Sequence, residues 1–228
     1  MPLDPDSAIA ELYAAFSRPT APIVYGCPCC ITPEELAALT ATPLRDVSAE
    51  VLEPYAFSVM LTVGDSEDLR YFWPRLVELL FRGELLTDQE IVFAAPDRAG
   101  WRGWPVGEQR ATERFVAAVI NDMTTRPYEG RDVDSWVCAF SRLLEDIIPW
   151  LQPLLTTTPA AAASLRGFYG VNEDRLRRGR LRNAFWDSFP GKEQKLVEWL
   201  RSPDVLDAVT RAYALLDLGM EPLRAPDA

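Results

Sequence analysis

The sequence predicts an all-α protein, built either as an irregular helical bundle or as an array of HEAT-like helical hairpins. Helix-start signals recur along the chain, and apolar residues return at helical spacing. Only Ile23-Val24-Tyr25 has the composition of a strand, and it is too short to found a sheet. The chain has 228 residues, of which 48% are hydrophobic, and this is enough to bury a large core.

Capping residues mark several helix starts. Asp4-Pro5 and Ser202-Pro203 each place a capping side chain before a proline that suits the first helical turn. Thr32-Pro33-Glu34-Glu35 and Thr87-Asp88-Gln89-Glu90 have the spacing of a capping box. With the apolar periodicity, these signals predict helices at 5–18, 33–40, 48–61, 65–81, 88–95, 108–124, 132–155, 160–168, 191–201 and 204–217.

The strongest apolar stripes lie in two of these helices, 65–81 and 132–155. Each contains a proline, Pro74 or Pro149, which lacks an amide donor, so we expect a kink or break there. The pattern P-x-L-x-x-L-L begins at both prolines, which is the basis for the HEAT-like alternative. The stripes consist of Leu69, Phe72, Trp73, Leu76, Val77 and Leu80, and of Val133, Trp136, Val137, Phe140, Leu144 and Ile147.

A short Thr- and Ala-rich segment, 156–163, divides the predicted helices. We therefore expect a main helical domain at residues 1–155 that contains a cysteine-rich turn. A smaller helical part at 156–228 would pack on it.

Charge and composition exclude several classes of function. The chain has no histidine, which removes Ser-His-Asp and Cys-His catalysis and the common histidine-based zinc sites. A formal net charge of −11 disfavours nucleic acids and anionic membranes and favours a basic protein partner. Neither a secretory leader nor a long apolar run is evident, so we expect a cytoplasmic protein.

Three of the four cysteines lie in Cys27-Pro28-Cys29-Cys30, just before a predicted helix start whose amides favour thiolates. A zinc site could combine these three with Cys138, which lies off the apolar stripe of helix 132–155. Only half of the usual zinc knuckle is present, and the cysteines could instead be small buried side chains in a tight turn.

The same four residues resemble the C-P-x-C active site of glutaredoxins, although the alternating strands and helices of that fold are absent. This favours an alternative function as a thiol oxidoreductase or thiol-based redox sensor. Cys27 and Cys30 would be catalytic, with Cys29 or Cys138 as the resolving cysteine.

A glycine-rich loop at 96–107 contains Trp101, Arg102 and Trp104. Tryptophan and arginine on a loop are favoured interface anchors, so we assign these three residues to partner binding. Alternatively, both indoles fold back over the core.

Two other charged groups have simpler explanations. The arginines between Arg166 and Arg182 could grip a phosphate, but carboxylates such as Glu173, Asp174 and Asp187 lie close enough to pair with them. Asp65 and Asp68 fall in the first turn of a predicted helix, where they would cap it.

The stretch Tyr25-Gly26-Cys27-Pro28-Cys29-Cys30, followed by Tyr55-Ala56-Phe57-Ser58 and by residues 68–75, resembles a group of uncharacterised bacterial proteins. The resemblance covers the first third of the chain. It implies a bacterial source and a cysteine turn that belongs with the helices after it, and no activity.

No complete catalytic constellation is present. The sequence therefore favours a non-enzymatic, acidic helical protein that binds a basic protein partner, for example an inhibitor or immunity-type protein. Its cysteine turn would be structural, with zinc as the candidate metal.

Overall fold

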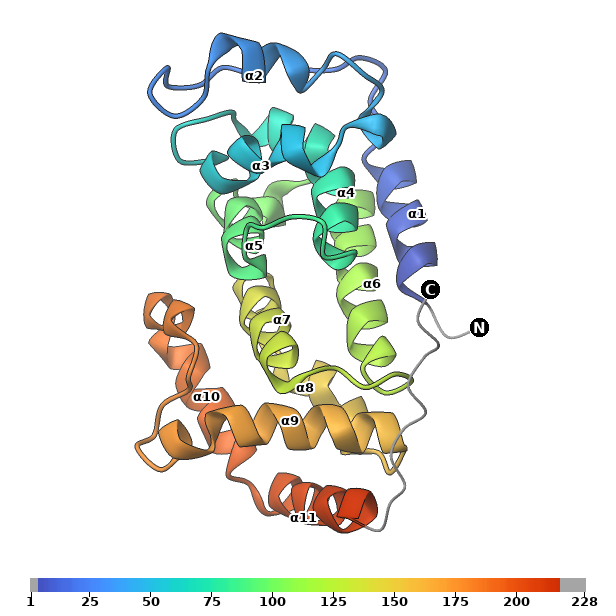
Figure 1. Cartoon of the computed structure of the whole chain (residues 1–228), viewed down its shortest axis with the longest axis vertical. Helices are drawn as coiled ribbons and strands as arrows, with labels where there is room; N and C mark the ends of the chain where they lie inside the picture. The colour runs from blue at the N-terminus through green and yellow to red at the C-terminus, as the bar shows by residue number, and fades with distance from the viewer. Residues whose placement is uncertain (1–3, 218–228) are drawn as a thin grey trace. The chain divides into compact units, whose positions relative to one another are not determined.

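The computed structural model describes residues 4–217 as an all-α protein that is 69% helical, and no β-strand occurs in that part of the chain (Figure 1). The predicted fold class is confirmed. The α-helices are α1 (Pro5–Ala15), α2 (Pro33–Ala38), α3 (Ala49–Ser58), α4 (Ser66–Phe81), α5 (Gln89–Arg98), α6 (Val106–Asp122), α7 (Gly130–Leu143), α8 (Ile148–Leu151), α9 (Pro159–Leu176), α10 (Pro190–Leu200) and α11 (Pro203–Asp217). Short 3-10 helices are η1 (Leu44–Asp46), η2 (Trp101–Gly103), η3 (Gln152–Leu155) and η4 (Ala184–Ser188).

The chain divides into two compact units, and the division falls inside α6. Residues Pro5–Phe115 form the first unit, and the described residues from Val116 onward belong to the second. The sequence placed its boundary after residue 155 instead, and that division stays a prediction.

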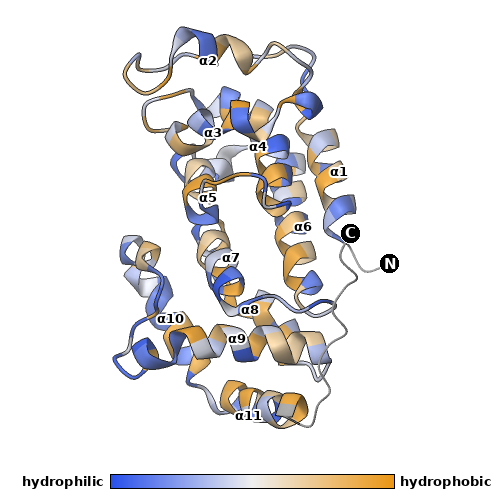
Figure 2. Ribbon diagram, viewed as in Figure 1, coloured by the Kyte–Doolittle hydropathy of each residue, from blue (hydrophilic) through white to orange (hydrophobic). Residues whose placement is uncertain are grey.

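In the first unit, α4 contacts α1, α3 and α5. Its Trp73 is fully buried, and the indole Nε1 donates a hydrogen bond to the Thr112 hydroxyl at 3.2 Å. Glu108 of α6, also buried, accepts hydrogen bonds from Arg70 at 2.7 and 2.8 Å and from Arg18 at 2.5 Å. Polar and apolar residues alternate along these helices, as expected where one side faces a core (Figure 2).

In the second unit, α9 packs against both α7 and α11. A Cβ added to Gly130 would lie 2.1 Å from the carbonyl oxygen of Gly167, so only glycine permits this approach of α7 to α9. The buried Asn172 side chain donates to Asp134 at 2.9 Å and accepts from the Arg182 amide at 2.8 Å. This polar link therefore ties α7, α9 and the following loop together.

Two predicted helix starts have different outcomes. Thr32 caps α2 as expected, because its hydroxyl accepts from the Glu35 amide while the Glu35 carboxylate accepts from the Thr32 amide. The prediction of a capping box that starts at Thr87 was wrong. The α5 N-cap is Asp88, and the Thr87 hydroxyl instead donates to the carboxylate of Glu53. Tertiary hydrogen bonding has replaced the local cap.

The single helix predicted over 132–155 was also wrong. The chain turns extended at Leu144 and resumes as α8 and η3, with Pro149 in the first turn of α8, where a missing amide costs nothing. Pro74, by contrast, lies inside the continuous helix α4. The two P-x-L-x-x-L-L motifs therefore adopt different local structures, and the repeat they suggested is not reproduced.

The strand-like run Ile23–Tyr25 forms no strand, and two isolated bridges lie near it, Gly26 with Val63 and Val59 with Val63. Among the helices of residues 4–217, none combines the length and apolarity needed to cross a lipid bilayer.

Candidate metal centre

The cysteine turn is held by backbone hydrogen bonds to the segment that follows α3. The Cys27 amide donates to the Thr62 carbonyl at 2.8 Å, and the Gly64 amide donates to the Tyr25 carbonyl at 2.7 Å. In this segment Met60 has a left-handed backbone with φ of 62°, the one such non-glycine residue among residues 4–217. Residues some 35 positions apart in sequence, by the numbering of Cys27 and Thr62, therefore form one framework.

The turn closes on itself and leads into α2. The amides of Cys30 and Ile31 both donate to the Cys27 carbonyl, at 2.8 and 3.2 Å. The Ile31 side chain is buried directly after the cysteines. A Cβ on Gly26 would lie 2.5 Å from the Ile31 Cγ2 methyl, so glycine is required where the chain enters the turn.

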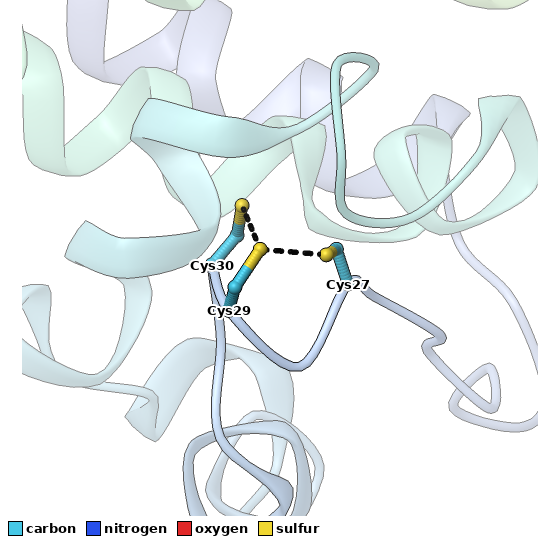
Figure 3. Close-up of side chains that lie close together, drawn as sticks. All are labelled: Cys27, Cys29 and Cys30. Carbon is cyan, nitrogen blue, oxygen red and sulfur yellow. Dashed lines mark hydrogen bonds between the residues drawn. The ribbon is translucent and has the colours of Figure 1, made fainter.

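The three thiols form a compact cluster. The Sγ atoms of Cys27 and Cys29 are 2.8 Å apart, those of Cys29 and Cys30 are 3.7 Å apart, and all three lie within 4.8 Å of one another. Figure 3 shows them in a bent arrangement, with the Cys29 sulfur between those of Cys27 and Cys30. Cys29 and Cys30 are exposed and Cys27 is half-buried, so the cluster is open to solvent.

The sulfurs differ in acidity. Hydrogen bonds from the thiol and the backbone of Cys29 lower the pKa of Cys27 below its usual value near 9. The same interaction with Cys27, together with Cys30, raises the pKa of Cys29 to about 11. One thiolate, on Cys27, is therefore stabilised by a neighbouring thiol, as in clusters that are poised to bind a metal or to exchange disulfides.

The donor set fits a soft metal ion. Thiolates favour Zn²⁺, Cu⁺ and iron–sulfur centres over hard cations. Two sulfurs on a tetrahedral zinc ion, with Zn–S near 2.3 Å, lie about 3.8 Å apart, close to the separation between Cys29 and Cys30. Cys27 would have to move about 1 Å away from Cys29 to reach that spacing. Cys27, Cys29 and Cys30 form the one group of three or more metal-ligating side chains found among residues 4–217.

Cys138 lies in α7 of the second unit, where its side chain is fully buried. It does not belong to the three-sulfur group that the geometry identifies. Its role as a fourth ligand stays a prediction.

The tryptophans assigned to partner binding are buried. Trp101 is 3% exposed and Trp104 is 6% exposed. The Trp104 ring packs edge-on against Phe16 and Trp73, with ring centroids 5.7 and 6.4 Å apart. The loop therefore takes the arrangement in which its indoles fold over the core. The partner-binding role of Trp101, Arg102 and Trp104 stays a prediction, and the burial of the two indoles does not support it.

Three of the arginines between Arg166 and Arg182 have partners within the protein, and one of them, Arg166, lies over the ring of Tyr213. Arg177 pairs with Glu173 at 2.9 Å, and Arg180 pairs with Glu193 at 2.9 Å and with Asp187. These pairs reduce the positive charge available to a phosphate.

The predicted capping carboxylates also serve the fold. Asp65 is the N-cap of α4, and the Asp68 carboxylate accepts a hydrogen bond from the Asp65 amide at 3.1 Å.

Comparison with models of protein families, with curated protein sequences and with solved structures finds no match. The resemblance of the first third of the chain to a group of bacterial proteins therefore stays a prediction. Any function has to be argued from the residues themselves.

Sequence reasoning found the cysteines but missed what positions them. Thr62 and Val63 act through their backbone, and no side-chain pattern reports such a role. The glycine at position 64, which has a positive φ, is the sequence signal of a turn at this place.

Proposed function

We propose that this chain is a non-enzymatic, acidic helical protein that binds a protein partner and whose turn at Cys27–Cys30 holds a zinc ion through three thiolates. The observation that carries the metal part is the gathering of three sulfurs within 4.8 Å on a turn that backbone hydrogen bonds fix from both sides.

Zinc suits this turn for two reasons. It has no redox chemistry, and its lack of geometric preference from d-electrons lets it accept ligands from a short sequence such as Cys-Pro-Cys-Cys. It would also fix the three cysteine side chains of the turn that leads into α2, a helix none of whose side chains is buried. A bound ion would stabilise this end of the first unit.

The partner-binding part is supported by charge. The chain carries 34 acidic and 23 basic residues, and an acidic surface accelerates encounter with a basic protein.

Metal content tests the proposal directly. Protein purified without a chelator should contain about one zinc per chain, as expected for a thiolate site of this kind. Cys27, Cys29 and Cys30 should be protected from a thiol reagent until a chelator is added. Cys29→Ser should bind the ion more weakly and retain less of it after purification, whereas Ser58→Ala, a matched change in the same unit, should retain as much as the wild type. No bound metal, with all three thiols reactive, would contradict zinc binding.

A second function, thiol redox chemistry, is favoured by the closeness of Cys27 and Cys29, whose sulfurs are 2.8 Å apart. The Cys27 thiolate would attack a peroxide, giving a sulfenic acid and releasing hydroxide or water. The Cys29 thiol would then displace water to form a disulfide. Here the nearest resolving sulfur belongs to Cys29 and not to Cys30. Unchanged peroxide sensitivity in Cys27→Ser would end this alternative.

A further inference from the structure

An open apolar groove lies beside the cysteine turn, in the first unit. Its volume is about 730 Å³, and it runs between α3 and the segment that follows α4. Cys30 forms part of its wall. The lining residues are Cys30, Ala49, Glu50, Glu53, Pro54, Phe57, Ser58, Glu84 and Leu86.

Two large apolar side chains in this groove face solvent. Phe57 is 62% exposed and Leu86 is 89% exposed. Exposed large apolar side chains that gather around a hollow are typical of a binding surface and not of a solvated one. Tyr25 and Leu61, on the two segments that hold the cysteine turn, are also exposed, at 75% and 61%.

Leu86 is held in place by the groove itself. The Glu53 carboxylate accepts a hydrogen bond from the Leu86 amide at 2.9 Å and another from the Thr87 hydroxyl. Because both carboxylate oxygens are used, the 86–87 segment is fixed to α3. Leu86 is therefore presented at the groove and does not collapse into it.

The charge of the groove has one sign. Glu50, Glu53 and Glu84 line it, and no lysine or arginine does. Glu53 is occupied as described. No ion pair engages Glu50 or Glu84 within the part of the chain that the structure describes, residues 4–217. Two carboxylates therefore remain available at the edge of an apolar surface.

We propose that this groove binds a basic amphipathic helix of a partner protein. Apolar side chains of the helix would lie between Phe57 and Leu86, and its lysines or arginines would pair with Glu50 and Glu84. This proposal rests on the partner-binding half of the proposed function and gives it a surface and a partner chemistry. It replaces the Trp101 loop as the docking site, because those indoles are buried.

Other occupants fit the groove less well. An anionic membrane would be repelled by the three glutamates and by the net charge of −11. A second copy docked groove to groove would place the same glutamates opposite one another. A basic helix satisfies both the apolar surface and the charge.

The probe is a fluorescent synthetic helix about five turns long, with leucine along one face and lysine on the other. Fluorescence anisotropy would measure its binding to the full chain at low and high salt. A second peptide carries glutamate in place of every lysine. We expect the lysine peptide to bind, with affinity that falls as salt rises, and the glutamate peptide not to bind.

Variants locate the binding. Phe57→Ser with Leu86→Ser should weaken it at least tenfold. Glu50→Gln with Glu84→Gln should weaken it severalfold and reduce its salt dependence. Val106→Ser is the matched control, because Val106 is a similarly exposed apolar residue at 59% and does not line the groove. Circular dichroism melting of each variant separates lost binding from lost folding.

Three results would overturn the proposal. Equal binding by the groove double variant and by Val106→Ser would place the peptide elsewhere. Equal binding of the lysine and glutamate peptides would remove the charge complementarity. Self-association that is abolished by Phe57→Ser and Leu86→Ser would make a second copy the occupant.

The result can be separated from that of the metal site. Cys27→Ser with Cys29→Ser changes two proposed zinc ligands but no residue that lines the groove. Peptide binding that persists in this variant supports the groove whether or not zinc binds. If the wild-type chain contains zinc but does not bind the lysine peptide, the groove proposal is wrong and the metal-site proposal is unaffected.

Discussion

The amide of Cys27 donates a hydrogen bond to the carbonyl of Thr62 at 2.8 Å. This contact joins the cysteine turn to the segment that follows α3, so the geometry of the thiols depends on the fold of that segment. A cluster of three sulfurs on a free peptide would sample many arrangements, whereas here the backbone limits them.

The first prediction concerns thiol reactivity in the metal-free, reduced protein. Because hydrogen bonds from Cys29 lower the pKa of Cys27, its thiolate is populated at lower pH and should be alkylated first. Cys29, whose pKa is raised to about 11, should react slowly until strongly alkaline pH. Peptide mass spectrometry after timed iodoacetamide treatment across a pH series gives the order. Faster alkylation of Cys29 than of Cys27 would show that Cys27 is not the more acidic thiol.

The second prediction concerns Gly26. In Gly26→Ala the new methyl would meet the Ile31 Cγ2 atom at 2.5 Å, and buried, branched Ile31 has little room to move. We expect a loss of about 1–3 kcal/mol in unfolding free energy together with weaker metal binding. Gly107→Ala is the control, because nothing lies within 4 Å of a Cβ there, inside α6. Chemical denaturation of both variants would show whether the clash is real, since equal stabilities would exclude it.

The third prediction concerns Asp68, whose carboxyl is nearly buried. Burial, with the charge of Asp65, raises its pKa to about 6. The folded state therefore binds a proton more tightly than the unfolded state, and this group makes stability rise as the pH falls from about 7 towards 4. In Asp68→Asn, the new amide oxygen can still accept the hydrogen bond from the Asp65 amide, and the buried charge is removed. The variant should therefore be more stable than the wild type by on the order of 1 kcal/mol at pH 7. Urea unfolding at pH 7 and pH 5 would test this, and a larger gain at pH 5 would contradict it.

The fourth prediction concerns Glu108. Burial alone would raise its pKa, but hydrogen bonds and charge from Arg70 and Arg18 together outweigh burial and hold the pKa below the usual 4.5. Its ion pairs therefore contribute fully above about pH 4.5, and the contribution is lost as the pH falls through the lower folded pKa.

Glu108→Gln should accordingly destabilise the chain at pH 7 by about 2 kcal/mol, because it leaves two arginines facing a neutral amide. The difference from wild type should shrink in acid. Glu113→Gln, a change in the same helix, serves as the control. A constant difference between wild type and Glu108→Gln from pH 7 down to pH 3 would show that the ion pairs contribute little.

Much of the helical framework could be predicted from local chemistry. The cap at Thr32 and the proline starts at Pro5 and Pro203 are local signals, and helices begin where they predict. Thr87 failed for a tertiary reason, since Glu53 offered its hydroxyl a better partner than the helix amides did.

The helix predicted over 132–155 shows another limit. Its apolar stripe continues past residue 143, but α7 ends there. The Lys192 ammonium caps this end by donating hydrogen bonds to the carbonyls of Ser141 and Leu144 at 2.6 and 2.7 Å. A cap supplied by a residue some 50 positions away leaves no mark in the local pattern.

The cysteine cluster was visible in sequence because its members are adjacent, whereas the groove was not. Phe57 and Leu86 resemble ordinary core positions when each is considered in its own helix or loop. The position of Leu86 is fixed by the hydrogen bonds of Glu53, which only the folded chain brings to Leu86 and Thr87.

Cys138 shows the reverse problem: it lies off the apolar stripe, yet it is buried because α7 is covered on most sides.

X-ray absorption spectroscopy of the zinc-loaded protein tests the central claim most directly, because it counts the sulfur atoms around the metal. We predict at least three sulfur ligands near 2.3 Å in the wild type and one fewer in Cys29→Ser. A first shell of oxygen or nitrogen alone, or a shell that Cys29→Ser leaves unchanged, would contradict a metal centre at Cys27, Cys29 and Cys30.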